Sequence, residues 1–443
     1  MQIAVPELSL IVLIGPSSTG KSTFARAHFR PTEVLSSDAC RALVADDEND
    51  QTATDAAFAV LHYIAGQRLT RGRLTVVDAT NVRPRARIPL LELARRNHVA
   101  AVAIVFDLPE SITGERLRGR TDRRFGPEVI AQHREQLHRS LPTLGKEGFR
   151  HVHVLRTPED VDAVRIVREP LPVDRRSERG PFDVVGDVHG CADELEELLD
   201  RLGYAPDGAG DGQAAWRHPG GRRAIFVGDL VDRGPRVVDV LRLVMRMVDA
   251  GAALCVPGNH DDKLMRKLRG GDVQIAHGLE VTLAQLAPEP PAFRAAVADF
   301  VASLPSHFVL DGGRLVVAHA GMKGPLQGRD SRRVRDFALY GETTGEVDEL
   351  GLPVRYNWAA EYRGRALVVY GHTPVSEPEW VRQTMNIDTG CVFGGKLTAL
   401  RYPELELVSV PARRPYAASA RPFLAEPAPS PPLPAGGSPR PER

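Results

Sequence analysis

At 443 residues the chain is too long for one ordinary core, so we expect two or three domains. A hydrophobic content of 42% and a charged content of 26% are typical of a water-soluble globular protein, not of a disordered chain. The formal net charge of zero argues against a broad surface that coats nucleic acid nonspecifically.

The first part of the chain alternates strand-like and helix-like segments. Strands are predicted at residues 8–14, 74–78, 99–106 and 151–155, with helices such as 56–69 and 127–140 between them. The apolar run at 8–14 is too short to cross a bilayer and follows no basic segment, so we expect a buried strand and no membrane association. The alternation predicts a parallel sheet covered on both faces.

A Pro- and Arg-rich segment at 169–181 breaks this pattern and predicts a domain boundary. Further strands, each ending at a polar cluster, are predicted at 182–186, 224–228, 253–257, 314–319, 367–371 and 385–388. Beyond residue 411 the chain is rich in Pro, Ala and Ser, which predicts a disordered tail. We therefore expect three parts, at 1–170, 171–411 and 412–443.

The four cysteines, Cys40, Cys191, Cys255 and Cys391, lie far apart in the sequence and form no C-x-x-C pair. This usage predicts a reduced, cytoplasmic protein and argues against a structural zinc site.

A glycine-rich turn follows the first predicted strand. Gly15-Pro-Ser-Ser-Thr-Gly20-Lys21-Ser22 has G-x-x-x-x-G-K-S spacing, and a helical segment starts at Thr23. In such a loop backbone N–H groups converge on phosphate oxygens, the lysine reaches the β- and γ-phosphates, and the serine hydroxyl ligates Mg²⁺. The turn, through Gly15, Gly20, Lys21, Ser22 and Thr23, therefore predicts a site for ATP or another NTP with Mg²⁺. The alternative is a chance Gly/Ser-rich turn.

Asp38 lies just beyond the next strand, and Arg41 follows it. A carboxylate in that place can accept a hydroxyl proton in phosphoryl transfer. The competing interpretation is a helix N-cap, which position alone favours because a helical run follows. Asp78 ends an apolar strand that resembles the one supporting the metal in P-loop enzymes.

Arginines crowd one short segment of the first part. They are Arg116, Arg118, Arg120, Arg123 and Arg124. Such a cluster can close over a nucleotide and stabilise charge on the transferring phosphoryl group. A solvated helix face is the alternative for any single one of them.

The second part carries five polar clusters in chain order. They are Gly186-Asp187-Val-His189-Gly190, Gly228-Asp229-Leu-Val-Asp232-Arg233-Gly234, Gly258-Asn259-His260-Asp261, His319-Ala-Gly321 and Gly371-His372-Thr373. Carboxylates with imidazoles suit two divalent transition-metal ions about 3.5–4 Å apart, Mn²⁺ foremost, with Ni²⁺, Co²⁺, iron or Zn²⁺ as alternatives.

The order of the clusters predicts which residues bind each metal ion and which act on the substrate. Asp187 and His189 are expected to hold one ion, with Asp229 bridging. The second ion is expected on Asn259, His319 and His372. We expect His260 to protonate the leaving oxygen and Arg233 to clamp the phosphate.

These clusters resemble the calcineurin-type metallophosphoesterase superfamily, and with the upstream loop the chain resembles bacterial polynucleotide kinase-phosphatases of RNA end healing. Further segments carry the likeness: Ser36–Arg41, Asp46–Gln51, Val77–Asn81, Arg120–Arg123, Tyr340–Gly345, Arg355–Trp358 and Asn386–Gly390. The likeness covers about residues 8–411. It implies an α/β fold, with a P-loop NTPase-type parallel-sheet kinase domain followed by a calcineurin-like metallophosphoesterase α/β sandwich.

The resemblance implies a 5′-hydroxyl polynucleotide kinase joined to a phosphatase of 2′,3′-cyclic and 2′- or 3′-phosphate ends, acting on RNA or DNA in RNA repair. It makes Asp38 the general base and places Arg41 at the acceptor end. It places Arg116 at the donor phosphates, with Arg120 and Arg123 in the same nucleotide-binding segment. Asp388 is expected to orient His372.

That family also carries a ligase-like domain after the phosphatase, where this sequence has the Pro-rich tail. A separate ligase or other RNA-modifying partner is therefore expected to seal the ends, unless the ligase portion is missing from this sequence. The oligomeric state stays open, a homodimer included.

Two other functions stay open. One is a Ser/Thr phosphoprotein or dinucleoside polyphosphate phosphatase whose P-loop domain only senses NTP. The other makes the first part a binding module that docks the phosphatase on a partner. Asp38 and the arginine cluster argue against a mere sensor.

Overall fold

The computed structural model describes residues 1–118, 126–207, 215–347, 349 and 353–419. It divides the chain into two compact units, Met1–Asp174 with Gly328–Arg335, and Arg175–Gln327 with Asp336–Arg443. The segment Gly328–Arg335, which the sequence analysis assigned to the second part, therefore groups with the first unit.

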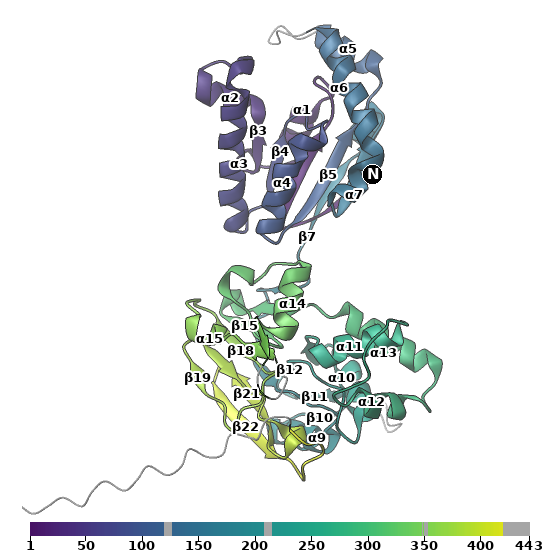
Figure 1. Ribbon diagram of the computed structural model, residues 1–443, viewed down its shortest axis with the longest axis vertical. Coiled ribbons are helices and arrows are strands. Elements are labelled where there is room, and N and C mark those ends of the chain that lie inside the picture. Colours follow the sequence, from purple (N-terminus) through teal and green to yellow (C-terminus); the bar gives the residue numbers. More distant parts are fainter. Residues whose placement is uncertain (119–125, 208–214, 348, 350–352, 420–443) are drawn as a thin grey trace, which may run out of the picture. The chain divides into compact units, whose positions relative to one another are not determined.

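The first unit is built on a parallel five-stranded sheet in the order β3-β4-β2-β5-β6 (Figure 1). The strands are β2 (Ser9–Ile14), β3 (Val34–Ser36), β4 (Thr75–Asp78), β5 (Ala100–Phe106) and β6 (His151–Leu155). The helices are α1 (Lys21–His28), α2 (Ser37–Ala45), α3 (Thr54–Thr70), α4 (Pro84–Arg96), α5 (Glu110–Arg118), α6 (Pro127–Ser140), α7 (Leu144–Glu147) and α8 (Pro158–Asp162).

The central strand β2 shows why this sheet is covered on both faces. Leu10 and Val12 lie in one buried cluster, and the alternate residues Ile11 and Leu13 lie in another. Because side chains along a strand alternate between faces, a continuous apolar run needs cover on both sides. Outside this sheet, β1 (Gln2–Pro6) pairs in parallel with β7 (Arg165–Glu169), a pairing that the sequence analysis did not predict.

The second unit contains two sheets, in the orders β13-β12-β9-β21-β22 and β19-β20-β18-β15-β14-β8. The first contains β9 (Phe182–Val185), β12 (Arg223–Phe226), β13 (Ala253–Cys255), β21 (Lys396–Tyr402) and β22 (Glu406–Pro411). The second contains β8 (Asp174–Arg175), β14 (His307–Leu310), β15 (Leu315–Ala318), β18 (Leu367–Tyr370), β19 (Trp380–Val381) and β20 (Thr384–Asn386). Short pairs are formed by β10 (Ala205–Pro206) with β11 (Trp216–Arg217) and by β16 (Thr343–Val347) with β17 (Pro353–Arg355).

Apolar side chains from both sheets meet in one core, for example Val184 and Ile225 from the first sheet with Val317 and Val369 from the second. The opposite face of the first sheet packs against helices such as α9 and α10. The helices after β9 are α9 (Ala192–Leu202), α10 (Val237–Asp249), α11 (Asn259–Leu268), α12 (Leu279–Leu286), α13 (Pro291–Ser303), α14 (Arg332–Tyr340) and α15 (Trp358–Glu361).

The predicted fold class, a P-loop-type parallel-sheet domain followed by a metallophosphoesterase α/β sandwich, is confirmed. The start of the expected tail differs from the prediction, because the N–H groups of Tyr416 and Ala417 donate to the carbonyl of Val392. Residues 420–443 lie outside the described residues. Among the described helices, none combines the length and apolar character needed to cross a bilayer.

Candidate two-metal site and nucleotide pocket

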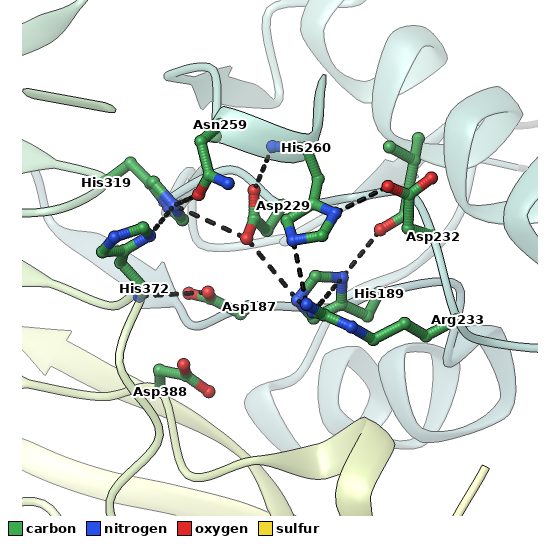
Figure 2. A network of polar contacts seen from close by, with 12 residues as sticks. Asp187, His189, Asp229, Asp232, Arg233, Asn259, His260, His319, His372 and Asp388 are labelled. Atoms are coloured by element: carbon green, nitrogen blue, oxygen red, sulfur yellow. Dashed lines mark hydrogen bonds and ion pairs between the residues drawn. The ribbon is translucent and has the colours of Figure 1, made fainter. Parts of the chain in front are cut away.

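The five polar clusters of the second unit converge because their strands end together. β9, β12 and β13 are parallel neighbours, so the loops that follow them leave the same edge of one sheet. β15 and β18 are parallel neighbours in the other sheet. Figure 2 shows the side chains of these loops turned toward one another around Asp229.

Asp229 occupies the centre of the site. Its Oδ2 lies 3.5 Å from His189 Nε2 and 3.5 Å from His319 Nε2, and Oδ1 accepts a hydrogen bond from the backbone N–H of His260 at 3.0 Å. The ligand atoms fall into two groups, His189-Asp229-His260 and Asp229-His319-His372. Asp229 alone belongs to both, which is the arrangement a bridging carboxylate requires.

The imidazoles are held with one nitrogen turned inward. Nδ1 of His189 lies 2.7 Å from the carbonyl oxygen of Val231, and Nδ1 of His319 lies 3.0 Å from that of Val227. Each carbonyl accepts from the Nδ1–H, which leaves the Nε2 lone pair for an ion. Burial lowers the pKa of both imidazoles, which favours the neutral form that can ligate a metal.

The second group contains His319, Asn259 and His372. His319 Nε2 lies 3.0 Å from Asn259 Oδ1 and 3.0 Å from His372 Nδ1. Asp187 Oδ2 accepts the backbone N–H of His372 at 3.0 Å, which joins the loop after β9 to the loop after β18.

Two buried polar atoms test whether cations fit here. Asp187 Oδ1 and His372 Nε2 are shielded from solvent and have no hydrogen-bond partner among the described residues. Buried polar atoms without partners are costly, and metal coordination satisfies them. The donor set of carboxylates, imidazoles and one amide suits divalent transition metals.

The pKa values of Asp187 and Asp229 are shifted in opposite directions. Burial, with the negative charges of Asp388 and Asp229, raises the pKa of Asp187. Burial opposes ionisation of Asp229 as well, but the surrounding imidazoles, His319 first among them, lower its pKa. The ionised form is therefore more favoured at Asp229 than at Asp187, and a bound cation would favour it at both.

Two glycines allow the loops of the site to lie close to its carboxylates. A Cβ at Gly371 would lie 1.9 Å from Asp187 Oδ1, and a Cβ at Gly258 would lie 2.1 Å from Asp229 Oδ1. Either side chain would displace a carboxylate from the site.

His260 and Arg233 lie on one side of Asp229. His260 Nδ1 is 2.6 Å from Asp232 Oδ2, and Thr282 Oγ1 donates to Asp232 Oδ1 at 2.6 Å. Arg233 lies 2.7 Å from His189 Nε2 through Nη1 and 3.0 Å from His260 Nε2 through Nη2. The expected proton donor and phosphate clamp therefore face the same space as the metal ligands.

Asp388 differs from its expected role. Its Oδ1 accepts the backbone N–H of Gly390 at 3.0 Å. His372 uses Nδ1 toward His319, and its Nε2 has no partner in the described structure, so no hydrogen bond from Asp388 orients it. Burial, together with the charge of Asp229, raises the pKa of Asp388 to about 7.

Sequence reasoning missed two supports of this site. Thr282, on α12, orients Asp232 and is far from every motif in the sequence. Asp261 accepts backbone N–H groups of Leu230 at 3.0 Å and Gly258 at 2.8 Å, and so joins two of the loops. Asp261 was visible in its motif, but only the fold shows what it binds.

The first unit contains a cavity of about 1930 Å³ at the glycine-rich loop. Gly20, Lys21, Ser22 and Thr23 line it, together with Asp38, Arg41 and Asp78. Lys21 Nζ donates to the loop carbonyls of Gly15 at 2.9 Å and Pro16 at 2.6 Å. The lysine is therefore held at the loop that the motif predicts for phosphate.

Asp38 faces this cavity and does not cap the helix. The side chain of Ser36 accepts the backbone N–H groups of Asp38 and Ala39, which makes Ser36 the N-cap of α2. The carboxylate of Asp38 instead accepts a hydrogen bond from Arg41 at 2.6 Å. The structure thus removes the main objection to Asp38 as a base.

Arg116, on α5, reaches the loop through a hydrogen bond from Nη1 to the carbonyl of Thr19 at 3.0 Å. Arg120 and Arg123 lie outside the described residues. A residue that the sequence analysis missed, His133 on α6, also lines the cavity, and burial, then Lys21 and Arg83, lowers its pKa to about 4.

Comparison with known proteins matches two families. The model of the calcineurin-like phosphoesterases matches residues 180–409, and the model of a family described as AAA domain matches residues 10–144. A bis(5′-nucleosyl)-tetraphosphatase PrpE [asymmetrical] of Anoxybacillus flavithermus is 47% identical over 252 residues, which are 55% of this chain and 99% of the relative.

Proteins with the same name from two other bacteria have a similar sequence identity to this chain. The one from Geobacillus thermodenitrificans is 48% identical, and the one from Bacillus subtilis is 47% identical. Each match covers 53% of this chain and 96% of the relative.

Proposed function

The chain belongs to the calcineurin-like phosphoesterase family, and we propose that it combines a phosphoesterase of this kind with a P-loop kinase in one two-site enzyme of nucleic-acid ends. The second unit hydrolyses phosphate esters with two divalent metal ions. The first unit transfers a phosphoryl group from ATP or another NTP, with Mg²⁺, to a 5′-hydroxyl. The second removes 2′,3′-cyclic or 2′- and 3′-phosphates.

The hydrolytic half of the proposal depends on one observation, the position of Asp229 Oδ2 at 3.5 Å from both His189 and His319. Two divalent ions, Mn²⁺ in our proposal, would supply Lewis acidity and lower the pKa of water there. Asp187, His189 and Asp229 would hold one ion, and Asp229, Asn259, His319 and His372 the other. Arg233 orients the phosphate, and His260, held by Asp232, delivers a proton to the leaving oxygen.

The transfer half depends on Asp38 and Lys21 lining one cavity while Ser36 caps the helix. A carboxylate in reach of an acceptor hydroxyl, opposite a phosphate-binding loop, is the arrangement for proton removal in phosphoryl transfer. Arg41, in contact with Asp38, would meet the acceptor end, and Arg116 the donor phosphates.

A second candidate function comes from the relatives. Their name describes asymmetric hydrolysis of bis(5′-nucleosyl) tetraphosphates, and the one from Anoxybacillus flavithermus is 47% identical to this chain over 252 residues. Yet the 252 matched residues are 99% of that relative, which therefore has room for only one of the two units. The added unit favours an enzyme whose two sites treat one substrate.

The test uses the full chain with three substrates. We expect transfer of labelled γ-phosphate from ATP to an oligonucleotide with a 5′-hydroxyl, and release of phosphate from one ending in a 2′,3′-cyclic phosphate. The third substrate is a bis(5′-nucleosyl) tetraphosphate. Chelation should stop hydrolysis, and Mn²⁺ should restore it.

The Asp229→Asn protein, purified in the same way, controls for contaminating hydrolases. Rapid cleavage of the tetraphosphate without phosphoryl transfer and without action on oligonucleotide ends would instead establish the second candidate.

A further inference from the structure

A second cluster of metal-ligand side chains lies in the second unit outside the two-metal site. Cys191, Glu194 and Cys391 are buried, at 0%, 0% and 2% exposure, and ligand atoms of the three lie within 4.8 Å of one another. Cys191 immediately precedes α9, and Glu194 lies in its first turn. Cys391 lies between β20 and β21. Both cysteines are free thiols.

Glu194 points to a cation. Its Oε1 accepts hydrogen bonds from Tyr416 Oη at 2.7 Å and from the backbone N–H of Arg413 at 2.9 Å. Its Oε2 is buried and has no hydrogen-bond partner within the described part of the chain. A bare carboxylate oxygen in an interior is costly unless a cation or a donor meets it.

The surroundings offer this oxygen little else. Ala192, Leu195 and Val392 belong to the same apolar cluster as the two cysteines. Cys191 directs its thiol to the carbonyl of His189 at 3.8 Å. Ligand atoms of the two thiols and the carboxylate therefore lie together inside an apolar shell and offer a cation three protein ligands.

We propose that Cys191, Glu194 and Cys391 bind one thiophilic cation, Zn²⁺ or Cu⁺, at a structural site distinct from the catalytic pair. Two thiolates select such soft cations over Mg²⁺ or Mn²⁺. Each thiol releases its proton to solvent as the sulfur–metal bond forms, and Glu194 supplies the third bond through an oxygen. The sequence analysis argued against a structural zinc site because the cysteines are far apart along the chain, but folding brings two of them together.

The position of this site gives the cation a role. Cys191 is two residues beyond His189, and Cys391 is three residues beyond Asp388. Glu194 also fixes the segment after β22 through Tyr416 and Arg413. One cation would thus tie together two loops at the two-metal site and the end of the described chain.

The experiment uses the full chain, stripped of metal under reducing conditions and titrated with Co²⁺. We expect a thiolate-to-cobalt charge-transfer absorption in the near ultraviolet, which the oxygen and nitrogen ligands of the catalytic pair do not give. Cys191→Ser and Cys391→Ser should each abolish the band. Cys255→Ser, a buried free thiol of the same unit outside the cluster, should keep it.

Addition of equal amounts of Zn²⁺ and Cu⁺ to the cobalt protein identifies the preferred cation, which is the one that remains bound after the band has disappeared. Absence of the band from the wild-type protein would overturn the proposal, as would its persistence in Cys391→Ser. So would a Cys191–Cys391 disulfide in peptide maps of the protein purified without reductant. If the serine variants do not fold, X-ray absorption of the wild-type cobalt protein decides: sulfur neighbours support the site, and their absence refutes it.

Discussion

Asp38 has two competing candidate roles, general base and helix N-cap. Ser36 is the N-cap of α2, which leaves the other role to Asp38. Ser36 Oγ accepts the N–H groups of Asp38 and Ala39 at 3.3 and 3.4 Å. Asp38 is left to pair with Arg41 and to face the cavity. The structural and chemical functions of this turn are therefore separable by substitution.

We predict that Asp38→Asn abolishes phosphoryl transfer and leaves thermal stability nearly unchanged, because the cap is intact. Ser36→Ala should do the reverse, costing about 1 kcal/mol of stability through loss of the cap while transfer continues. Labelled-phosphate transfer and thermal unfolding of both proteins are the measurements. Wild-type transfer rates in Asp38→Asn would remove Asp38 from the mechanism.

His307, the first residue of β14, makes the second unit sensitive to acid. It is fully buried, and burial, with the charge of Arg176, lowers its pKa from 6.5 to about 3. Above pH 6.5 the imidazole is neutral in both the folded and the unfolded chain, so its titration does not change the free energy of unfolding. Below that pH the unfolded chain takes up the proton first, so the free energy of unfolding falls as the pH falls toward 3.

Replacement by a residue that does not titrate should flatten this slope. We predict that the stability difference between wild type and His307→Gln narrows by about 2 kcal/mol between pH 7 and pH 5. Tryptophan fluorescence in urea reports on this unit alone, because all three tryptophans lie in it. A difference that stays constant with pH would show that folding does not lower the pKa of His307.

At the scale of elements, the site depends on how closely the loops after β9 and β18 approach. A Cβ at Gly371 would fall 1.9 Å from Asp187 Oδ1, whereas one at Gly324 would meet no atom within 4 Å. We predict that Gly371→Ala lowers hydrolysis at least tenfold and weakens metal affinity, because the carboxylate must move. Gly324→Ala should match the wild type in both. Equal activity of the two variants would show that the loop can retreat without cost.

The motifs at the strand ends could be predicted from the sequence, but contacts between residues far apart in the sequence could not. The buried run of β2 and the motifs after β9, β12 and β13 carry local signals, namely apolar periodicity followed by glycine and charge. The pairing of β1 with β7 joins residues about 160 positions apart, and Thr282 on α12 reaches Asp232 in the loop between β12 and α10. Such partners have no local pattern, since the fold alone makes them neighbours.

The cap of α2 shows a second limit. Ser36, Ser37 and Asp38 are all good capping residues, so composition cannot say which one ends the strand and which faces the cavity. The answer depends on where β3 stops against β4, a register that is set across the sheet.

At the scale of the whole molecule, the two sites lie in different compact units. A relative that is matched over 99% of its length by 252 residues of this chain has room for only one unit of this size. Each unit also has its own buried clusters, so neither site needs the core of the other. We therefore expect the hydrolytic reaction and the phosphoryl transfer to proceed independently of each other.

We therefore predict that Asp229→Asn removes hydrolysis and keeps phosphoryl transfer, since only the bridging ligand is lost. An equimolar mixture of Asp229→Asn and Asp38→Asn should process a nicked RNA with a 5′-hydroxyl and a 2′,3′-cyclic phosphate completely, because each protein supplies the reaction that the other lacks. Product analysis on denaturing gels measures both ends at once. If the mixture left either end untreated, the two sites would have to act within one molecule, and a single substitution that stopped both reactions would contradict separate sites.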